Sequence, residues 1–389
     1  MAFPGMIGSA MPPVVAYGWL LDSLIRNWAL LSILCTLAVL VLVPLLVLRR
    51  YVNLIVNIFD DTPPPLSMDL RDYDRLEGQP VVFRAFDGHA LHGMLLSGNE
   101  ASPRKGLILF AHEYASDGYS CSRYCRPLLA VGYDVLTFDF RGHGRSAGEE
   151  GYKPRQWPSD REQSDMLGAI AFAEDYLERR GRPREVGLFG ISRGGGAAIL
   201  ASVGLESVKA ILTDGAFSSD TTLEYLMQRW ASIFAKVRLI YENHPPTFWR
   251  FLRWLTFRQS RRRFNCRYPS VRKAIVRIGP RPIFLIHGER DSYIPVSQSQ
   301  LLYDLARGPR YLWIVPRAKH NQCIIQQPEE YAGLTVRFFD QHLARDAEGT
   351  DPLGSDSLNL LSQPLADPAE IRRRRGAPAI RRGLNGAKR

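Results

Sequence analysis

The sequence predicts an α/β fold, with a mostly parallel central sheet and helices on both of its faces. Strand-like apolar runs alternate with helix-like runs from residue 106 to residue 213. Before them, two strand-like runs joined by Asp87-Gly88 indicate an antiparallel hairpin. Residues 80–343 have the length of one ordinary α/β domain, so we expect a single domain there.

The expected elements follow one another in chain order. Residues 80–86 and 89–96 form the hairpin that opens the sheet. Later strands are expected at 106–112, 133–138, 185–189, 208–213, 282–287 and 311–316, and helices at 120–130, 160–180 and 193–203. We find no internal repeat.

One serine lies in a sharp turn between a predicted strand and a predicted helix. The turn reads Gly190-Ile191-Ser192-Arg193-Gly194. A bare Gly-x-Ser-x-Gly arises by chance in roughly one such protein in six, so its placement carries the argument. A strained strand-to-helix turn lifts the serine hydroxyl above the sheet edge, and its glycines avoid clashes with neighbouring backbone. We therefore predict that Ser192 is a nucleophile; the alternative is an ordinary turn serine.

A serine nucleophile requires a base and an orienting carboxylate, and candidates for both follow in the sequence. Asp291 lies in the loop after 282–287, and His320 lies in the loop after 311–316. Alone, the first would be a common turn former and the second a common surface residue. Their joint placement after successive strands predicts Asp291 as the acid and His320 as the base. Asp214 also ends a predicted strand and is the rival acid.

Three further stretches carry a family resemblance: Leu109-Phe110-Ala111-His112, Asp139-Phe140-Arg141-Gly142-His143-Gly144-Arg145-Ser146 and Asp214-Gly215-Ala216-Phe217-Ser218. With the serine turn, they make residues 80–343 resemble the α/β-hydrolase superfamily, close to its small-lid serine hydrolases with monoacylglycerol-lipase-like and serine-aminopeptidase-like domains. The resemblance implies the chain order Ser, Asp, His. It also implies an oxyanion hole formed by the backbone N–H groups of Arg193 and Tyr114.

One position departs from the family pattern. The family usually has His-Gly at the oxyanion loop, whereas this chain reads His112-Glu113-Tyr114. If the position requires a positive φ, glutamate is strained there. Either the loop follows a different local course, or Glu113 has a role of its own, such as tethering Arg193. Three histidines in family motifs are expected to hold loops together rather than to catalyse: His112, His143 and His287.

The sequence gives no sign of a cofactor, a metal or a nucleic-acid partner. The five cysteines show no spacing typical of a disulfide framework or a zinc site, so we expect reduced thiols: Cys35, Cys121, Cys125, Cys266 and Cys323. No glycine-rich phosphate loop follows a strand, so no cofactor and no metal are expected. The net charge of +11 comes without a nucleic-acid recognition motif.

A long apolar stretch follows the leader of residues 1–26. Residues 27–48 are 22 positions without a charged side chain, enough to cross a hydrocarbon core of about 30 Å. We predict a single-pass transmembrane helix. A signal peptide is the rival, but the run exceeds the usual apolar region; a buried helix is the other alternative. Two arginines follow the run, Arg49 and Arg50, and one precedes it, Arg26. Since positive charge favours the cytoplasmic side, we predict a cytoplasmic hydrolase domain.

Two segments flank the expected domain. Residues 49–79 are predicted to be a linker, stiffened by Pro63-Pro64-Pro65. Residues 344–389 lose periodicity and become rich in Gly, Pro, Ser and Arg, which predicts a disordered basic tail. The tail either is solvated or binds anionic headgroups.

Residues 221–279 are expected to form a lid over the active site. Its central segment places Phe248, Phe251, Leu252 and Leu255 on one predicted helical face, bordered by Trp249 and Trp254 and accompanied by several arginines. Such a helix either lies in the interface of an anionic membrane or packs on the domain with a solvated basic face.

Together these features predict a membrane-anchored serine hydrolase without a cofactor. The expected substrate is a carboxylic ester of a lipophilic or membrane-associated acyl group, cleaved through an acyl-enzyme. Thioester or amide hydrolysis by the same residues is the near alternative. A catalytically silent membrane scaffold is the alternative of another class, favoured only by Glu113. The oligomeric state stays open.

Overall fold

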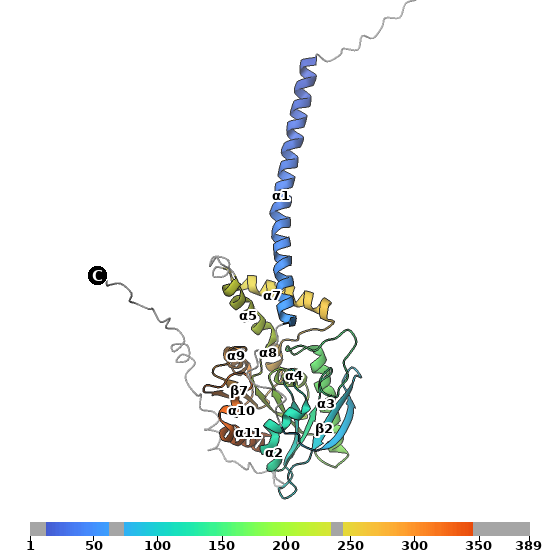
Figure 1. Ribbon diagram of the computed structural model, residues 1–389, viewed down its shortest axis with the longest axis vertical. Coiled ribbons are helices and arrows are strands. Elements are labelled where there is room, and N and C mark those ends of the chain that lie inside the picture. The colour runs from blue at the N-terminus through green and yellow to red at the C-terminus, as the bar shows by residue number, and fades with distance from the viewer. Residues whose placement is uncertain (1–12, 62–73, 235–243, 345–389) are drawn as a thin grey trace, which may run out of the picture. The chain divides into compact units, whose positions relative to one another are not determined.

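A computed structural model describes residues 13–61, 74–234 and 244–344. The chain divides into two compact units between Phe59 and Asp60. The first contains most of helix α1, and the second contains the sheet and all later helices (Figure 1). Residues 62–73, which hold the proline run, and residues 345–389, nearly all of the expected tail, lie outside the described residues.

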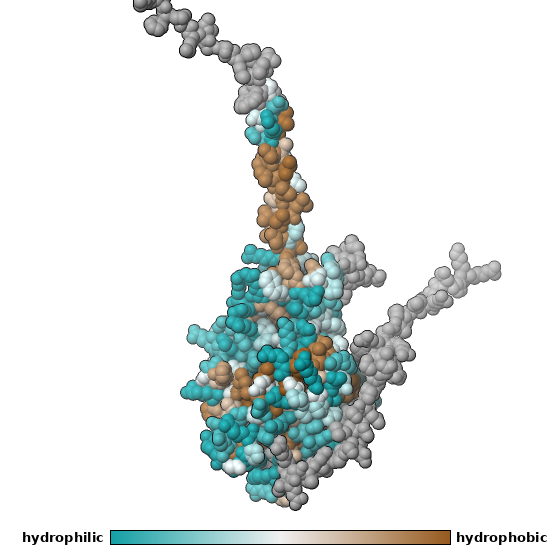
Figure 2. Space-filling view, turned by 180° about the vertical axis from the view of Figure 1, so that it is seen from behind, coloured by the Kyte–Doolittle hydropathy of each residue, from teal (hydrophilic) through white to brown (hydrophobic). Residues whose placement is uncertain are grey.

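Helix α1 spans Pro13–Asp61 and is longer than the expected segment 27–48. It continues because residues 51–61 contain no glycine or proline to end it, so the expected linker is helical up to residue 61. Its part Ile25–Asp60 is long and apolar enough to cross a membrane by length and composition. A signal sequence passes the same test, and the helix is compatible with a membrane anchor. Figure 2 shows its apolar side chains as a hydrophobic band.

The second unit contains one eight-stranded sheet in the order β1-β2-β4-β3-β5-β6-β7-β8. Its strands are β1 (Gln79–Arg84), β2 (Ala90–Leu96), β3 (Gly106–Ala111), β4 (Tyr133–Phe138), β5 (Val186–Ile191), β6 (Val208–Asp214), β7 (Ile283–Gly288) and β8 (Arg310–Val315). Strand β2 pairs antiparallel with β1 and β4, and the other pairs are parallel. The predicted α/β class and the opening hairpin are confirmed.

Helices cover both faces of the sheet (Figure 1). One buried cluster unites the sheet with α3 (Asp160–Glu178), α4 (Arg193–Ala201), α8 (Val271–Ile275) and α9 (Ser297–Leu305). The opposite cluster unites it with α2 (Cys121–Ala130), α10 (Cys323–Gln326) and α11 (Pro328–His342), and a short 3-10 turn, η1 (Gly118–Ser120), precedes α2. The central strands are therefore buried on both sides, which holds their carboxyl ends rigidly as a platform for loops.

The insertion between β6 and β7 contains α5 (Ser219–Phe234) and α7 (Pro246–Phe264), followed by α8. The buried residues of helix α7 are Trp249, Leu252, Thr256, Ser260 and Phe264, so only Leu252 of the expected apolar face is buried. Phe251 lies exposed instead. Aromatic residues occur around most of this helix, so periodicity alone does not select the buried side.

Candidate active site

Ser192 lies in the turn between β5 and α4. Its backbone has φ 51° and ψ −114°, a conformation that residues other than glycine rarely adopt. A Cβ on Gly190 would lie 2.5 Å from the Gly195 Cα, and one on Gly194 would lie 2.2 Å from the Ala111 oxygen. Both glycines are therefore sterically required: Gly190 lets β5 approach the start of α4, and Gly194 lets the serine turn approach the end of β3.

The structure brings the three predicted triad residues together from three loops at the carboxyl ends of parallel strands. The Ser192 Oγ lies 2.9 Å from the His320 Nε2, and the His320 Nδ1 lies 2.6 Å from the Asp291 Oδ2. Ser192, Asp291 and His320 are 6%, 8% and 7% exposed. A carboxylate only accepts hydrogen bonds, so the His320 Nδ1 donates to it and the Nε2 is free to accept the serine proton.

The loop around Asp291 holds its carboxylate in place. The Oδ1 accepts hydrogen bonds from the backbone N–H groups of Tyr293 and Ile294, at 2.9 and 2.8 Å. Burial alone would raise the pKa of Asp291, but the charge of His320 and hydrogen bonds from His287 and His320 hold that pKa well below its ordinary value. The acid therefore stays ionised.

His287 was expected only to hold a loop, but it contacts the carboxylate of Asp291 directly. Its Nε2 is 3.4 Å from the Asp291 Oδ2 and 3.0 Å from the Ile294 oxygen, and its Nδ1 is 2.7 Å from the Ser299 Oγ. Because both Nε2 neighbours are acceptors, the Nε2 carries a proton. His287 thus positions Asp291 from the end of β7. Sequence reasoning missed this contact, since the distance between a strand-end residue and a residue in the following loop is not fixed by their spacing in the sequence.

The rival acid, Asp214, has different partners. The hydroxyl of Tyr331 donates to its Oδ2 at 3.2 Å, and its Oδ1 has no hydrogen-bond partner among the described residues. Burial raises the pKa of Asp214 to about 6. Because the His320 Nδ1 is hydrogen-bonded to Asp291, Asp214 is not the orienting acid in this structure.

The oxyanion loop follows β3 and takes the different local course considered above. Within this loop the positive φ falls on Ala115, at 61°, and not on Glu113. The His112 Nε2 accepts from the Phe140 N–H, so its Nδ1 donates to the Glu113 oxygen at 2.6 Å. Burial lowers the pKa of His112 to about 3, so the imidazole that fixes this loop is neutral.

The Glu113 carboxyl group hydrogen-bonds to Ser120 and not to Arg193. The Ser120 Oγ donates to its Oε2 at 3.3 Å, and its Oε1 has no hydrogen-bond partner among the described residues. Burial raises the pKa of Glu113 from its ordinary 4.5 to about 7. The tether to Arg193 that was one of the two alternatives is therefore not formed, and Glu113 is a buried acid.

We expect Glu113 to make stability pH-dependent. A carboxyl with a raised pKa binds more protons folded than unfolded, so stability falls as the pH rises from about 4.5 to about 7 and stays lowered above that. Glu113→Gln should remove this loss, roughly 3 kcal/mol in size. Melting temperatures of the parent and the variant at about pH 5 and about pH 8 measure it. A constant difference across the pH range would contradict the assignment.

Arg193, the residue after the serine, is fully buried and paired. Its Nη1 lies 3.4 Å from the Glu162 Oε1 and donates to the Arg155 oxygen at 3.1 Å. Its guanidinium carbon lies 5.5 Å from the centre of the Tyr114 ring, within range of a cation–π contact. The two residues expected to supply the oxyanion N–H groups are thus linked through their side chains.

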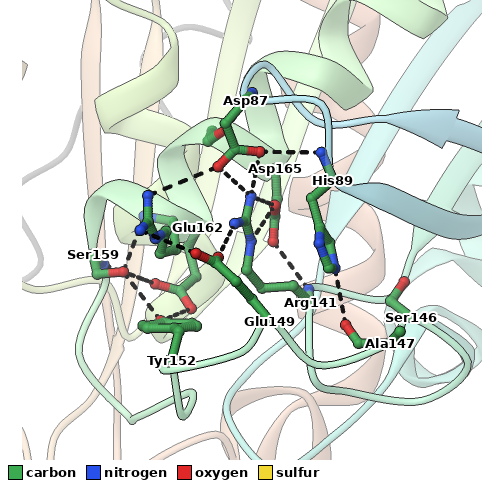
Figure 3. Close-up of polar contacts among 12 residues, drawn as sticks. Asp87, His89, Arg141, Ser146, Ala147, Glu149, Tyr152, Ser159, Glu162 and Asp165 are labelled. Atoms are coloured by element: carbon green, nitrogen blue, oxygen red, sulfur yellow. Dashed lines mark hydrogen bonds and ion pairs between the residues drawn. The ribbon is translucent and has the colours of Figure 1, made fainter. Parts of the chain in front are cut away.

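Glu162 belongs to a buried polar network (Figure 3). Its Oε2 accepts from the Ser159 N–H at 2.9 Å, closing the capping box of α3, and the Tyr152 hydroxyl donates to its Oε1 at 2.7 Å. Beside it, the buried guanidinium of Arg141 binds Asp165, Asp87 and Glu149. The start of α3 is therefore held firmly where it meets Arg193. The sequence signal for Glu162 is the capping box Ser159-x-x-Glu162.

A profile of the alpha/beta hydrolase family matches residues 90–334. The chain belongs to this family. The match covers the sheet from β2 to β8 together with all three triad loops. Family membership supports a hydrolase activity.

Named relatives agree with this placement. The uncharacterized protein YqkD of Bacillus subtilis is 26% identical over 275 residues, which cover 69% of this chain and 81% of that protein. Protein ABHD12B of Homo sapiens is 29% identical over 217 residues, covering 54% and 52%. Among solved structures, the Pyrococcus furiosus esterase Pf2001 aligns with a TM-score of 0.51 and 22% identity over 72% of this chain and 97% of that one. This last likeness shows the shared fold.

Proposed function

We propose that this hydrolase is a serine hydrolase that cleaves a carboxylic ester of a lipophilic or membrane-associated acyl group. The observation that carries the proposal is the hydrogen-bonded line from the Ser192 Oγ through His320 to Asp291. The name esterase borne by the Pyrococcus furiosus protein of the same fold supports ester substrates.

In the proposed reaction the Ser192 Oγ attacks the acyl carbonyl carbon while the His320 Nε2 takes its proton. The backbone N–H groups of Arg193 and Tyr114 hold the oxyanion that forms. His320 then returns the proton to the leaving alcohol, and the acyl group remains on Ser192. Water, activated by His320, releases the acid and restores the serine. Asp291 keeps the His320 Nδ1 protonated and aligned throughout.

A lipophilic substrate is proposed because the chain carries helix α1, which we propose as a single-pass anchor. By the charge bias around its apolar part, the hydrolase unit would face the cytoplasm. An enzyme held at a bilayer meets substrates dissolved in that bilayer at high local concentration.

The test is covalent labelling of the detergent-extracted full chain with a fluorophosphonate probe. We expect labelling that maps to the peptide containing Ser192. Ser192→Ala serves as the blank, and Ser202→Ala is the matched control, since its buried hydroxyl donates to the Ile199 oxygen at the far end of α4. Hydrolysis rates of an ester, a thioester and an amide of the same acyl chain then show which bond is cleaved fastest.

Two outcomes would contradict the proposal. Folded parent protein that does not label, whereas Glu113→Gly does, would favour a silent scaffold with a disabled oxyanion loop. Labelling that persists in Ser192→Ala would place the nucleophile elsewhere.

A further inference from the structure

The outward face of α7 has an unusual composition for a surface exposed to water. Phe251 is 48% exposed and Trp254 is 51% exposed, and their rings stack with centres 6.0 Å apart. They lie three residues apart, as neighbours on one side of a helix. A stacked pair of large aromatic rings left in solvent is unfavourable unless another surface covers it.

Positive charge surrounds this pair. The guanidinium of Arg258 lies over the Trp254 ring, with its carbon 5.4 Å from the ring centre. The other exposed arginines of α7 whose helical positions border the same side are Arg250, Arg261 and Arg262. Helix α7 contains no aspartate or glutamate from residue 246 to residue 264. The outward side therefore combines aromatic rings with arginines on a helix that carries no acidic residue of its own.

The opposite side of α7 is fixed to the hydrolase unit. Trp249, Leu252 and Thr256 are buried, and Arg253 pairs with Glu224 of α5. Helix α5 in turn reaches the acid loop, where the Arg229 Nη1 donates to the Ser292 oxygen at 2.8 Å. The outward aromatic residues are thus exposed while the other side of α7 is packed on the hydrolase unit. Through α5, helix α7 is also connected to the loop of the proposed acid.

We propose that the outward face of α7, formed by Phe251, Trp254, Arg250, Arg258, Arg261 and Arg262, binds the surface of an anionic phospholipid bilayer. Aromatic rings favour the region between headgroups and acyl chains, and arginines pair with headgroup phosphates. A protein partner would have to match a face made almost wholly of arginine and aromatic rings with acidic groups of its own, whereas an anionic bilayer supplies that charge continuously.

This inference rests on the proposed membrane-bound hydrolase and names its second contact with the bilayer. An anchor such as α1 makes a weak second contact effective, because the tethered unit stays near the bilayer. Contact of α7 with lipid would also place α5 and the acid loop near the source of a lipophilic acyl substrate.

The test follows a fluorescent probe on α7 in the full chain. In a Cys35→Ser background, where the other four cysteines are buried, Phe251→Cys carries an environment-sensitive dye. The control site is Glu178→Cys, at the exposed end of α3. Both proteins are placed in nanodiscs of phosphatidylcholine, alone or mixed with phosphatidylglycerol. We expect a blue shift and severalfold weaker iodide quenching at position 251 with the anionic lipid, and no change at position 178.

A second variant tests the charges. Neutralising Arg258, Arg261 and Arg262 to glutamine should abolish the response to the anionic lipid, while fluorophosphonate labelling of Ser192 continues. Equal quenching at positions 251 and 178 in both lipids would overturn the inference. So would protection at position 251 that grows with protein density regardless of lipid, because that result indicates contact with a second copy. Loss of labelling at Ser192 in the parent would instead refute the proposed hydrolase chemistry, independently of lipid binding.

Discussion

Asp291→Asn is expected to lower kcat by roughly 10⁴-fold, the loss known when a triad carboxylate is replaced by its amide. An asparagine side chain can present its N–H₂ group to the His320 Nδ1, which lies 2.6 Å from the acid in the parent. That would favour the wrong tautomer, with the proton on the Nε2, which then cannot accept from Ser192. Steady-state hydrolysis of a soluble ester measures the effect, with KM expected to change much less.

Asp214→Asn is the matched control for the acid. Asp214 is fully buried and hydrogen-bonds to Tyr331, so its amide should alter stability but leave kcat within about tenfold of the parent. A large loss of kcat in Asp214→Asn, with little change in Asp291→Asn, would mean that the rival acid serves His320 in solution. Melting temperatures of both variants separate misfolding from a chemical effect.

Glu162→Gln is expected to have the second largest effect, on both stability and turnover. Removing one partner of a buried ion pair leaves the other charge uncompensated, a loss of about 3–5 kcal/mol when the pair is fully broken. Arg193 is 0% exposed, so solvent does not take over the role of Glu162. Loss of the pair should shift the backbone N–H of Arg193. We therefore expect kcat to fall about tenfold to a hundredfold, because oxyanion donors act mainly in the transition state.

A double-mutant cycle isolates this pairing. Glutamine at position 162 retains a carbonyl oxygen for the Ser159 N–H, so the helix cap is preserved while the charge is removed. Glu162→Gln combined with Arg193→Gln removes both charges and should recover part of the stability lost in the single variant. Ser159→Ala reports the cap alone. Additive effects in the cycle would show that Glu162 acts only as a cap, and that Arg193 is held by its other contacts.

Local patterns in the sequence were sufficient for the fold and for the serine turn. Strand and helix periodicity located the sheet, and the glycines at 190 and 194 indicated a turn that no larger residue could form. These features depend on backbone sterics within a few residues, which is why a single sequence reveals them.

Features decided by contacts between distant elements needed the structure. The Ser192–His320 contact joins residues 128 positions apart, and the choice between Asp291 and Asp214 depends on where the His320 ring turns. The link from Glu162 to Arg193 has the same origin, since α3 and the serine turn meet only in the folded chain.

By itself the sequence determined an α/β fold, a strained serine turn and a long apolar helix, because these follow from short-range periodicity and steric limits, while its motifs gave the resemblance to the α/β hydrolases. Only the tertiary structure decided which acid faces His320, where the Glu113 carboxyl group points and which side of α7 is buried. Those outcomes depend on distances between side chains carried by different elements. The register of the sheet and the packing of its helices set these distances, and no local pattern encodes them.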